Sequence, residues 1–295
     1  MLPPTENIGE RAAISRGTAA DESALRRVKI IVAGTPKTGN TWIHFLLAEA
    51  FGMRHVDLHE DHRQDDWASF GPPWIGQQHY QPEADLLERA REHGVKFVCM
   101  IRHPADVLVS LRHHLESSAA APTTDPRLPQ SMLQDGPRVY GQHTLRFIEE
   151  GFYQVLHTSL CWMAGGWAHI VRYEDLYAHP LEVLRALTAR ICPLPEASLQ
   201  HAIAACGLDK MRNRHPGSKL FRRGGSGGWR NELPPELQRV LATMDPYPAQ
   251  SAAMGYQTGD LAAGAEGGPG IQHSSARPGT RRGAFPPIVK QVYAD

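Results

Sequence analysis

The sequence predicts an α/β fold, a single domain in which a central parallel sheet is flanked by helices in three layers. Three short apolar runs are typical of strands that are buried on both faces. A helical pattern follows each run, and repeated alternation of strand and helix favours a parallel sheet with helices on both sides. The predicted strands are residues 28–33, 95–101 and 168–173, and the helices that follow them are 41–51, 104–115 and 180–191.

The residues at the ends of these elements agree with the prediction. Pro104 and Pro180 begin the second and third helices, where a missing backbone N–H costs nothing. Gly52 suits the end of the first helix, because glycine readily adopts the left-handed conformation that ends many helices. In parallel α/β sheets, ligands bind beyond the carboxyl ends of the strands. Functional residues are therefore expected directly after each predicted strand.

Composition divides the chain of 295 residues into one domain with irregular ends. Residues 1–26 mix Pro, Gly, Ser and charged residues without periodicity, which predicts a mobile leader. Residues 257–295 are rich in Gly, Pro and Ser, a composition typical of a flexible tail. The folded domain is predicted over 27–256. Within it, residues 117–142 are too long for an ordinary connection, so a mobile lid or substrate loop and plain disorder both stay open.

The charge balance and the cysteines limit the possible partners. The 31 Lys and Arg residues balance 31 Asp and Glu residues, so no overall field favours nucleic acid or an anionic membrane. No apolar run approaches the roughly 20 residues of a membrane span, and the N-terminus lacks an apolar signal core. Four cysteines without a C-x-x-C pair favour reduced, packed thiols. A cytoplasmic protein without nucleic-acid or membrane partners is expected, and the oligomeric state is not predicted.

The stretch after the first strand carries the most informative local pattern. Gly34 and Gly39 have the spacing of a phosphate-binding P-loop, and Thr41 stands where its Ser/Thr would be. Asn40, however, replaces the lysine that reaches the phosphates of ATP or GTP, and the cation lies within the turn at Lys37. A purely structural turn is the alternative. The pattern predicts an architecture like that of the P-loop nucleotide kinases, with a cradle for a phosphate-rich donor other than ATP.

Two further segments carry cations and hydrogen-bond donors that suit phosphate. Arg102 ends the second strand and Ser110 lies two turns into the next helix. A guanidinium can grip a phosphate with two hydrogen bonds, and a hydroxyl adds another. The later loop, residues 221–229, contains Arg222 and Arg223 and four glycines between two aromatic residues. Taken singly, an arginine at a strand end is commonly a surface ion pair, and a glycine-rich loop is commonly a linker.

Together these segments resemble the cytosolic-type sulfotransferases, including bacterial small-molecule sulfotransferases, which use 3′-phosphoadenosine-5′-phosphosulfate (PAPS) and release adenosine 3′,5′-bisphosphate (PAP). Residues 36–42, Pro-Lys-Thr-Gly-Asn-Thr-Trp, look like the family's P-K-[ST]-G-[TN]-T-W loop. Residues 102–110 resemble its R-x-P-x-D-x-x-x-S element, 171–176 its V-x-Y-E-D-L stretch, and 222–229 its late R-K-G-x-x-G-x-W loop. The four matches follow one another in the family's order, and this makes the combination specific.

The resemblance implies roles for individual residues. It implies that Lys37 contacts the transferring sulfuryl group, as a catalytic and donor-binding residue, and that Trp42 and Tyr173 contact the adenine. The residues implied to line the 5′ end of the nucleotide are Thr38, Gly39, Asn40 and Thr41. Those implied to hold its 3′-phosphate are Arg102, Ser110, Arg222, Arg223 and Gly224.

The family's general base is a histidine in a short strand shortly before the 3′-phosphate element, and His79 stands at the matching place. A neutral imidazole near pH 7 suits removal of a proton from an acceptor hydroxyl. An outward-facing structural histidine is the alternative. Two departures from the family are visible: Gln77 stands where a lysine is frequent, and Gly207 and Leu208 replace a serine and a phenylalanine that contact the adenosine.

The resulting hypothesis is a PAPS-dependent sulfotransferase that modifies a hydroxyl of a small-molecule acceptor by in-line displacement, with His79 as base and no metal. A secondary metabolite is the expected acceptor rather than a protein or a polysaccharide, because a cytosolic chain without a membrane anchor is expected and no long basic groove for an anionic sugar chain is evident. One alternative is a P-loop small-molecule kinase that uses ATP and magnesium, which Asn40 and Arg102 disfavour. Another is a nucleotide-binding regulatory module that keeps the fold without group transfer.

Two other sets of residues have both a structural and a functional interpretation. Several aromatic side chains could line an acceptor pocket, although helix core is the expected role for most of them: Phe147, Phe152, Tyr153, Trp162 and Trp167. Residues 55–66 contain three histidines among carboxylates, with spacing that could ligate a divalent metal. The dense charge of this segment favours a solvated segment instead, which could face the acceptor.

Overall fold

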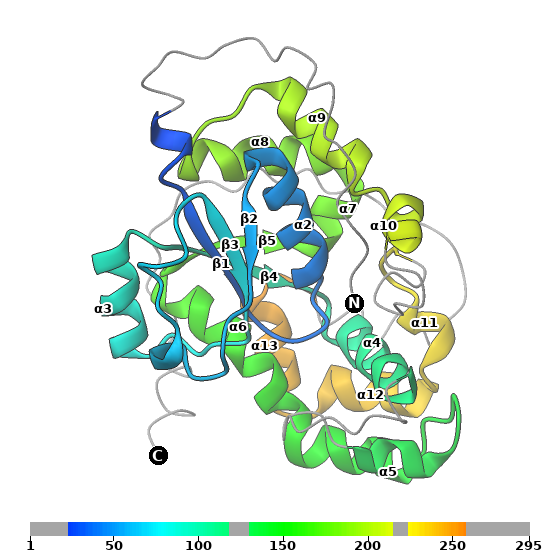
Figure 1. The fold of residues 1–295 in the computed structure, drawn as a ribbon. Coiled ribbons are helices and arrows are strands. Elements are labelled where there is room, and N and C mark those ends of the chain that lie inside the picture. Colours follow the sequence, from blue (N-terminus) through cyan, green and yellow to red (C-terminus); the bar gives the residue numbers. More distant parts are fainter. Residues whose placement is uncertain (1–22, 118–129, 215–223, 258–295) are drawn as a thin grey trace, which may run out of the picture.

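The computed structural model describes residues 23–117, 130–214 and 224–257, and its centre is a sheet of five parallel strands. The strands lie side by side in the order β2-β3-β1-β4-β5 (Figure 1). Their bounds are β1 (Lys29–Ala33), β2 (Arg54–Val56), β3 (Trp74–Gln77), β4 (Lys96–Ile101) and β5 (Ala168–Arg172). The predicted parallel α/β sheet is confirmed.

The three strands and three helices expected from the sequence are present, with ends that agree within two residues. The helices are α2 (Asn40–Phe51), α4 (Pro104–Ser117) and α8 (Pro180–Ile191). The sequence analysis missed β2 and treated β3 only as the short strand implied before His79. Both are brief, and β2 exposes two of its three residues, so neither makes a continuous apolar run.

The other helices connect and cover these strands. Before β5 they are η1 (His62–Gln64), α3 (Ala84–His93), η2 (Gln130–Asp135), α5 (Gln142–Phe147), a π-helical turn η3 (Ile148–Phe152) and α6 (Tyr153–Gly165). After β5 they are α7 (Tyr173–Ala178), α9 (Glu196–Ala205), α10 (Leu208–Arg214), α11 (Trp229–Glu232), α12 (Pro235–Thr243) and α13 (Tyr247–Ala253). Among the helices of the described ranges, none combines the length and apolar character that crossing a membrane requires.

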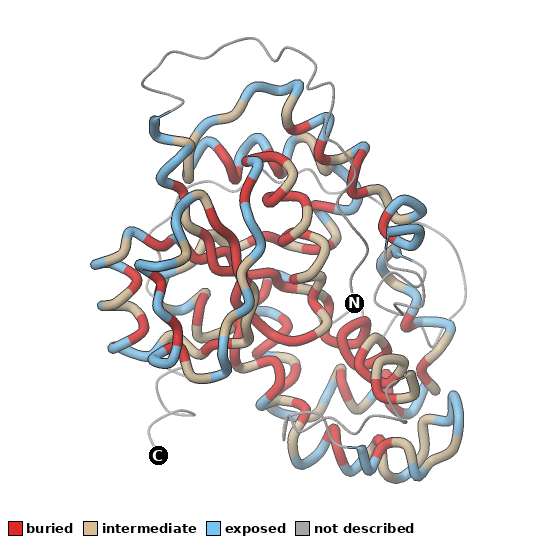
Figure 2. The backbone as a smooth tube through the Cα atoms, in the orientation of Figure 1, coloured by how far each residue is buried: buried red, intermediate tan, exposed pale blue. Residues whose placement is uncertain are grey.

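Alternation along β1 divides the core between the two faces of the sheet. Ile30 and Val32 pack in a cluster with apolar residues of α2, α8 and α9, whereas Ile31 and Ala33 pack with residues of α3 and α6. This is the two-residue period of a strand covered on both sides. A further buried cluster joins α4 to η3, α11 and α12, and Figure 2 shows the buried backbone concentrated in the strands and the helix faces against them.

The topology brings the predicted functional segments to one edge of the sheet. Because all strands are parallel, the residues after β1, β3, β4 and β5 emerge at the same edge. The chain runs from β1 to β2 and β3 on one side of β1, and then crosses to β4 and β5 on the other side. A crevice at such a reversal is the usual place for a ligand in an open parallel sheet.

The predicted domain limits and the cysteines can be compared with the described residues only in part. Residues 1–22 and 258–295 lie outside them, so the leader over 1–26 and the tail over 257–295 stay predictions. Within 117–142, residues 118–129 also lie outside, and 130–135 form η2, so a lid stays a prediction too. All four cysteines are described and all are free thiols.

Candidate active site

The turn after β1 is held in shape by hydrogen bonds beneath it. The amide N–H of Thr35 donates to Ser159 Oγ at 2.9 Å, and the Thr35 hydroxyl donates to the Val155 carbonyl at 2.9 Å. The Thr35 carbonyl in turn accepts from Thr38 Oγ1 at 2.8 Å and from Asn40 Nδ2 at 2.9 Å. These bonds tie the turn to α6 and fix its backbone.

The glycine at the end of this turn is required by its surroundings. Gly39 has φ 103°, in the left-handed region, and a Cβ there would lie 2.6 Å from Tyr173 Cδ2. As the N-cap of α2, Gly39 has no side chain that could bond the first helical N–H groups. The first N–H groups of a helix have no partner within it, and the helix dipole makes this end positive. The turn therefore presents donors to an anion.

Lys37 adds a cation above these amides. Its backbone adopts φ 68°, a conformation that costs free energy in a residue with a Cβ and that is enriched at functional sites. Burial, and in second place the positive charge of Arg102, lower the pKa of Lys37 to about 8. The ammonium is thus mainly protonated at pH 7, but it loses its proton far more easily than a solvated lysine.

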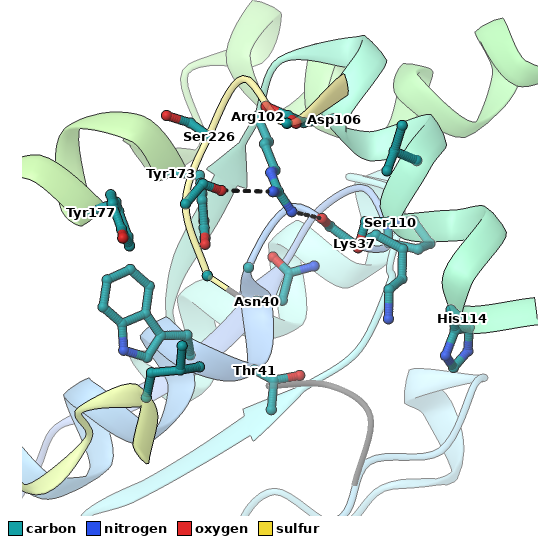
Figure 3. Close-up of a pocket in the computed structure, with 18 of the residues that line it drawn as sticks. Lys37, Asn40, Thr41, Arg102, Asp106, Ser110, His114, Tyr173, Tyr177 and Ser226 are labelled. Atoms are coloured by element: carbon teal, nitrogen blue, oxygen red, sulfur yellow. Dashed lines mark hydrogen bonds between the residues drawn. The ribbon is translucent and has the colours of Figure 1, made fainter. Parts of the chain in front are cut away.

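Arg102 joins the end of β4 to the turn and to the glycine-rich loop, of which residues 224–228 are described. Its Nη1 donates to the Lys37 carbonyl at 3.3 Å and its Nη2 to the Gly225 carbonyl at 3.1 Å. The guanidinium carbon lies 4.2 Å from the centre of the Tyr173 ring, and Figure 3 shows Arg102 between Tyr173 and Lys37. Arg102 Nε is buried and has no hydrogen-bond partner among the described residues.

Asp106 anchors the glycine-rich loop. Its carboxylate, buried on α4, accepts from the N–H of Gly227 at 2.7 Å and from the N–H of Trp229 at 3.4 Å. The loop passes close to Tyr177 and Leu208, because a Cβ at Gly224 would lie 3.2 Å from the Leu208 side chain and 3.5 Å from the Tyr177 ring. Asp106 therefore fixes the loop over one side of the crevice.

Three aromatic rings gather beside the first turn of α2. The Trp42 and Tyr173 rings meet edge to face with their centres 5.9 Å apart, and the Tyr173 and Tyr177 rings stack at 6.2 Å. Trp42 Nε1 donates to the Cys206 carbonyl at 3.2 Å, which holds the indole in place. The Tyr177 side chain is half-exposed and, like Trp42 and Tyr173, faces the crevice. Flat rings in this arrangement suit a purine base.

His79 follows β3 at the other end of the crevice. Its Nδ1 lies 2.7 Å from the carbonyl oxygen of Gly34. A carbonyl can only accept, so Nδ1 carries the hydrogen, and in a neutral imidazole Nε2 is then the basic nitrogen. The turn after β1 thus also fixes the tautomer of His79.

These parts enclose one cavity of about 590 Å³. The predicted site residues that line it are Lys37, Gly39, Asn40, Thr41, Trp42, His79, Arg102, Ser110, Tyr173 and Gly224. Thr38 does not line it, because its side chain is buried beneath the turn. Arg222 and Arg223 lie outside the described residues.

Sequence reasoning missed several residues of the cavity, among them Asp106, His114 and Tyr177. Asp106 belongs to the R-x-P-x-D-x-x-x-S pattern, but the pattern alone gave it no role. His114 and Tyr177 each lie four residues after a predicted site residue, Ser110 and Tyr173. That spacing places two side chains on one face of a helix and is the signal that could have identified them.

The aromatic residues considered for an acceptor pocket lie elsewhere. Phe147, Phe152 and Trp162 are buried in the helix core, as expected for most of the set. Trp167 is exposed, and neither it nor Tyr153 lines the cavity.

The histidines of residues 55–66 have separate partners and do not form one metal site. His55 Nδ1 lies 2.6 Å from His44 Nε2, and His59 Nδ1 lies 2.7 Å from Asp65 Oδ1. His62 is buried rather than solvated, with its Nε2 at 3.4 Å from Asp85 Oδ2. None of these histidines lines the cavity, so the idea that they face the acceptor gains no support.

A parallel sheet with an anion-binding turn after β1 defines an α/β protein of P-loop-like, nucleotide-binding architecture. The model of the sulfotransferase domain family matches residues 27–244, and the chain belongs to this family. No match to the chain is found among curated protein sequences.

Two solved structures show the same fold at low sequence identity. Mouse sulfotransferase SULT7A1 complexed with PAP is 14% identical, with a TM-score of 0.56, and the match covers 81% of this chain and 94% of that one. Retinol dehydratase in complex with androsterone and inactive cofactor PAP is 13% identical, with a TM-score of 0.51, and the match covers 78% of this chain and 80% of that one.

Proposed function

We propose that the protein transfers the sulfuryl group of PAPS to a hydroxyl of a small-molecule acceptor and releases PAP. The observation that carries the proposal is that the Lys37 turn, Arg102 and the aromatic rings line one and the same cavity. Family membership supports the reaction class, and both structural relatives are complexes with PAP.

The donor groups of the cavity fit the two anionic ends of this nucleotide. At the 5′ end, Lys37 and the N–H groups at the start of α2 would bind the phosphosulfate. At the other end, Arg102, whose Nε is an unsatisfied buried donor, would hold the 3′-phosphate together with Ser110, Arg222, Arg223 and Gly224. Trp42 and Tyr173 would contact the adenine. Tyr177 would complete the part of the cavity that holds the adenine, where Leu208 replaces the family's phenylalanine.

The residues at the 5′ end have distinct tasks in the transfer. His79 Nε2 takes the proton of the acceptor hydroxyl while its oxygen forms a bond to sulfur. The bond between sulfur and the bridging oxygen of the phosphate breaks, and PAP leaves with the electron pair. Lys37 and the helix N–H groups stabilise the charge that grows on these oxygens. The Gly34 carbonyl keeps His79 in the tautomer that can act as the base.

Asp106→Asn should weaken PAP binding about tenfold, because the loop next to Arg102 loses charge-assisted hydrogen bonds worth about 1.5–3 kcal/mol each. Asn can still accept one of the two N–H groups, so the fold should persist. Isothermal titration with PAP measures the change, with Asp209→Asn, a side chain 91% exposed, as the matched control. Equal PAP affinity in D106N and wild type would show that this carboxylate does not support the site.

Incubation of the purified protein with PAPS and a panel of phenols, catechols, aliphatic alcohols and polyols tests the proposed function. Mass spectrometry should detect a sulfated product and an equal amount of PAP for at least one acceptor. Binding of PAP without transfer to any acceptor would instead indicate a regulatory module. We further propose that the natural acceptor is a hydroxylated secondary metabolite in the cytoplasm, because no basic groove for an anionic polymer is evident in the sequence.

A further inference from the structure

The end of the cavity near Lys37 has a second imidazole, that of His114. This residue lies on α4 one helical turn after Ser110, and both side chains line the cavity. Figure 3 shows its ring at the same end as the Lys37 side chain, away from Tyr177 and the aromatic end. The transfer end is therefore flanked by two histidines from different elements, His79 after β3 and His114 on α4.

Within the described residues, the surroundings of the His114 ring differ from those of the adjacent His113. No hydrogen bond joins the ring to another residue in the described part of the chain, although its carbonyl accepts from Ser117. The adjacent His113, by contrast, pairs with Glu232. Burial, and then the charge of Lys37, lower the pKa of His114, which favours the neutral form of the ring. A neutral imidazole offers one donor and one acceptor, the same combination as a hydroxyl group.

Gln77 adds another polar side chain to the end of the cavity near Lys37. It ends β3, lines the cavity together with His79, and offers an amide that can donate and accept hydrogen bonds. A purely apolar acceptor would cover these polar groups without replacing their hydrogen bonds to water, which is unfavourable. Because Gly34 already directs His79 Nε2 to the proton of the reacting hydroxyl, His114 is left for another group of the acceptor.

We propose that His114 is a specificity-determining residue that hydrogen-bonds a second hydroxyl of the acceptor, next to the one that is sulfated. The substrate class is then a vicinal diol or a catechol rather than a compound with a single hydroxyl. This inference rests on the proposed function of the same site. A site that hydrogen-bonds a substrate hydroxyl discriminates strongly against the analogue that lacks it, because its own polar group loses a partner.

The experiment compares matched acceptors, catechol with phenol and 1,2-propanediol with 1-propanol, in the wild type and three variants. The wild type should prefer the diol of each pair by about tenfold or more in kcat/KM, mainly through a lower KM. His114→Phe, similar in size but apolar, should reduce this preference to about one by affecting the diol alone. His114→Gln should restore part of it. The control His201→Gln changes a histidine that lies outside the cavity.

Measuring the Kd of PAP helps to distinguish a failure of the role given to His114 from a failure of the proposed function. The Kd of PAP should be the same in H114F and wild type, because His114 lies at the acceptor end. A wild type without preference for the diol, or an equal loss for both acceptors in H114F, would overturn the role of His114. A wild type that sulfates no acceptor would overturn the proposed function itself and this inference with it.

Discussion

Replacement of His79 by alanine should lower kcat by about 10²–10⁴, the usual contribution of a general base. The reason is the geometry of the ring. The Gly34 carbonyl, 2.7 Å from Nδ1, leaves Nε2 as the nitrogen that can accept the proton of the acceptor hydroxyl. The measurement is steady-state sulfation of one acceptor with saturating PAPS. The Kd of PAP should change little, because the base does not hold the nucleotide.

His79→Gln provides the matched variant. Glutamine can still donate to the Gly34 carbonyl from a similar position, but its amide cannot act as a base. H79Q should therefore be about as impaired as H79A. Near-normal kcat in H79Q would mean that the histidine only positions the turn, and near-normal kcat in H79A would remove it from the chemistry.

Lys37→Met should lower kcat by about 10²–10³, the usual cost of removing one group that stabilises transition-state charge. Methionine has a similar length without the ammonium, so the shape of the turn should be retained. The loss should appear in single-turnover experiments with bound PAPS, which separate transfer from donor binding. A K37M enzyme that transfers sulfate within tenfold of the wild type would contradict the role given to this cation.

The lowered pKa of Lys37 predicts the direction of two effects, one on the melting temperature of K37M and one on the pH dependence of PAP affinity. Folding moves the pKa from 10.5 to about 8, so the charged form is disfavoured in the folded protein and its cost is present below pH 8. K37M should therefore melt at the same or a higher temperature than the wild type. In the ligand-free protein the ammonium is lost as the pH rises through 8, so PAP affinity should fall above pH 8 in the wild type. In K37M the same titration should be nearly flat.

The parts of the fold that sequence predicted are those whose signal is local. The strands β1, β4 and β5 are continuous apolar runs because helices cover both faces of the sheet. β2 was missed because it has three residues and its side chains are mostly exposed. Its place at the sheet edge follows from pairing with β3, and no short-range pattern encodes that pairing.

The residues of the candidate site likewise divide into those with a local sequence signal and those whose role depends on tertiary packing. Lys37, Arg102 and Tyr173 follow strands that are neighbours in the sheet, and parallel topology alone brings such residues together. Asp106 could be quoted as part of a pattern, but its role depends on the N–H of Gly227, 121 residues away. The spacing from Ser110 could place His114 on the same face of α4, but its proximity to Lys37 depends on how α4 packs, which no local pattern encodes.

In the proposed function the cavity grips a nucleotide at two anionic ends, one of them a phosphate on the ribose. Isothermal titration of the wild type with PAP, adenosine 5′-monophosphate and ATP with magnesium measures the contribution of that phosphate. Each charge-assisted hydrogen bond to the 3′-phosphate contributes about 1.5–3 kcal/mol, so PAP should bind about 100-fold or more tightly than the monophosphate. In the Arg102→Gln variant, the difference between the affinities for PAP and for the monophosphate should shrink markedly. Equal affinities for PAP and the monophosphate, or tighter binding of ATP with magnesium, would contradict the proposed function and favour a kinase.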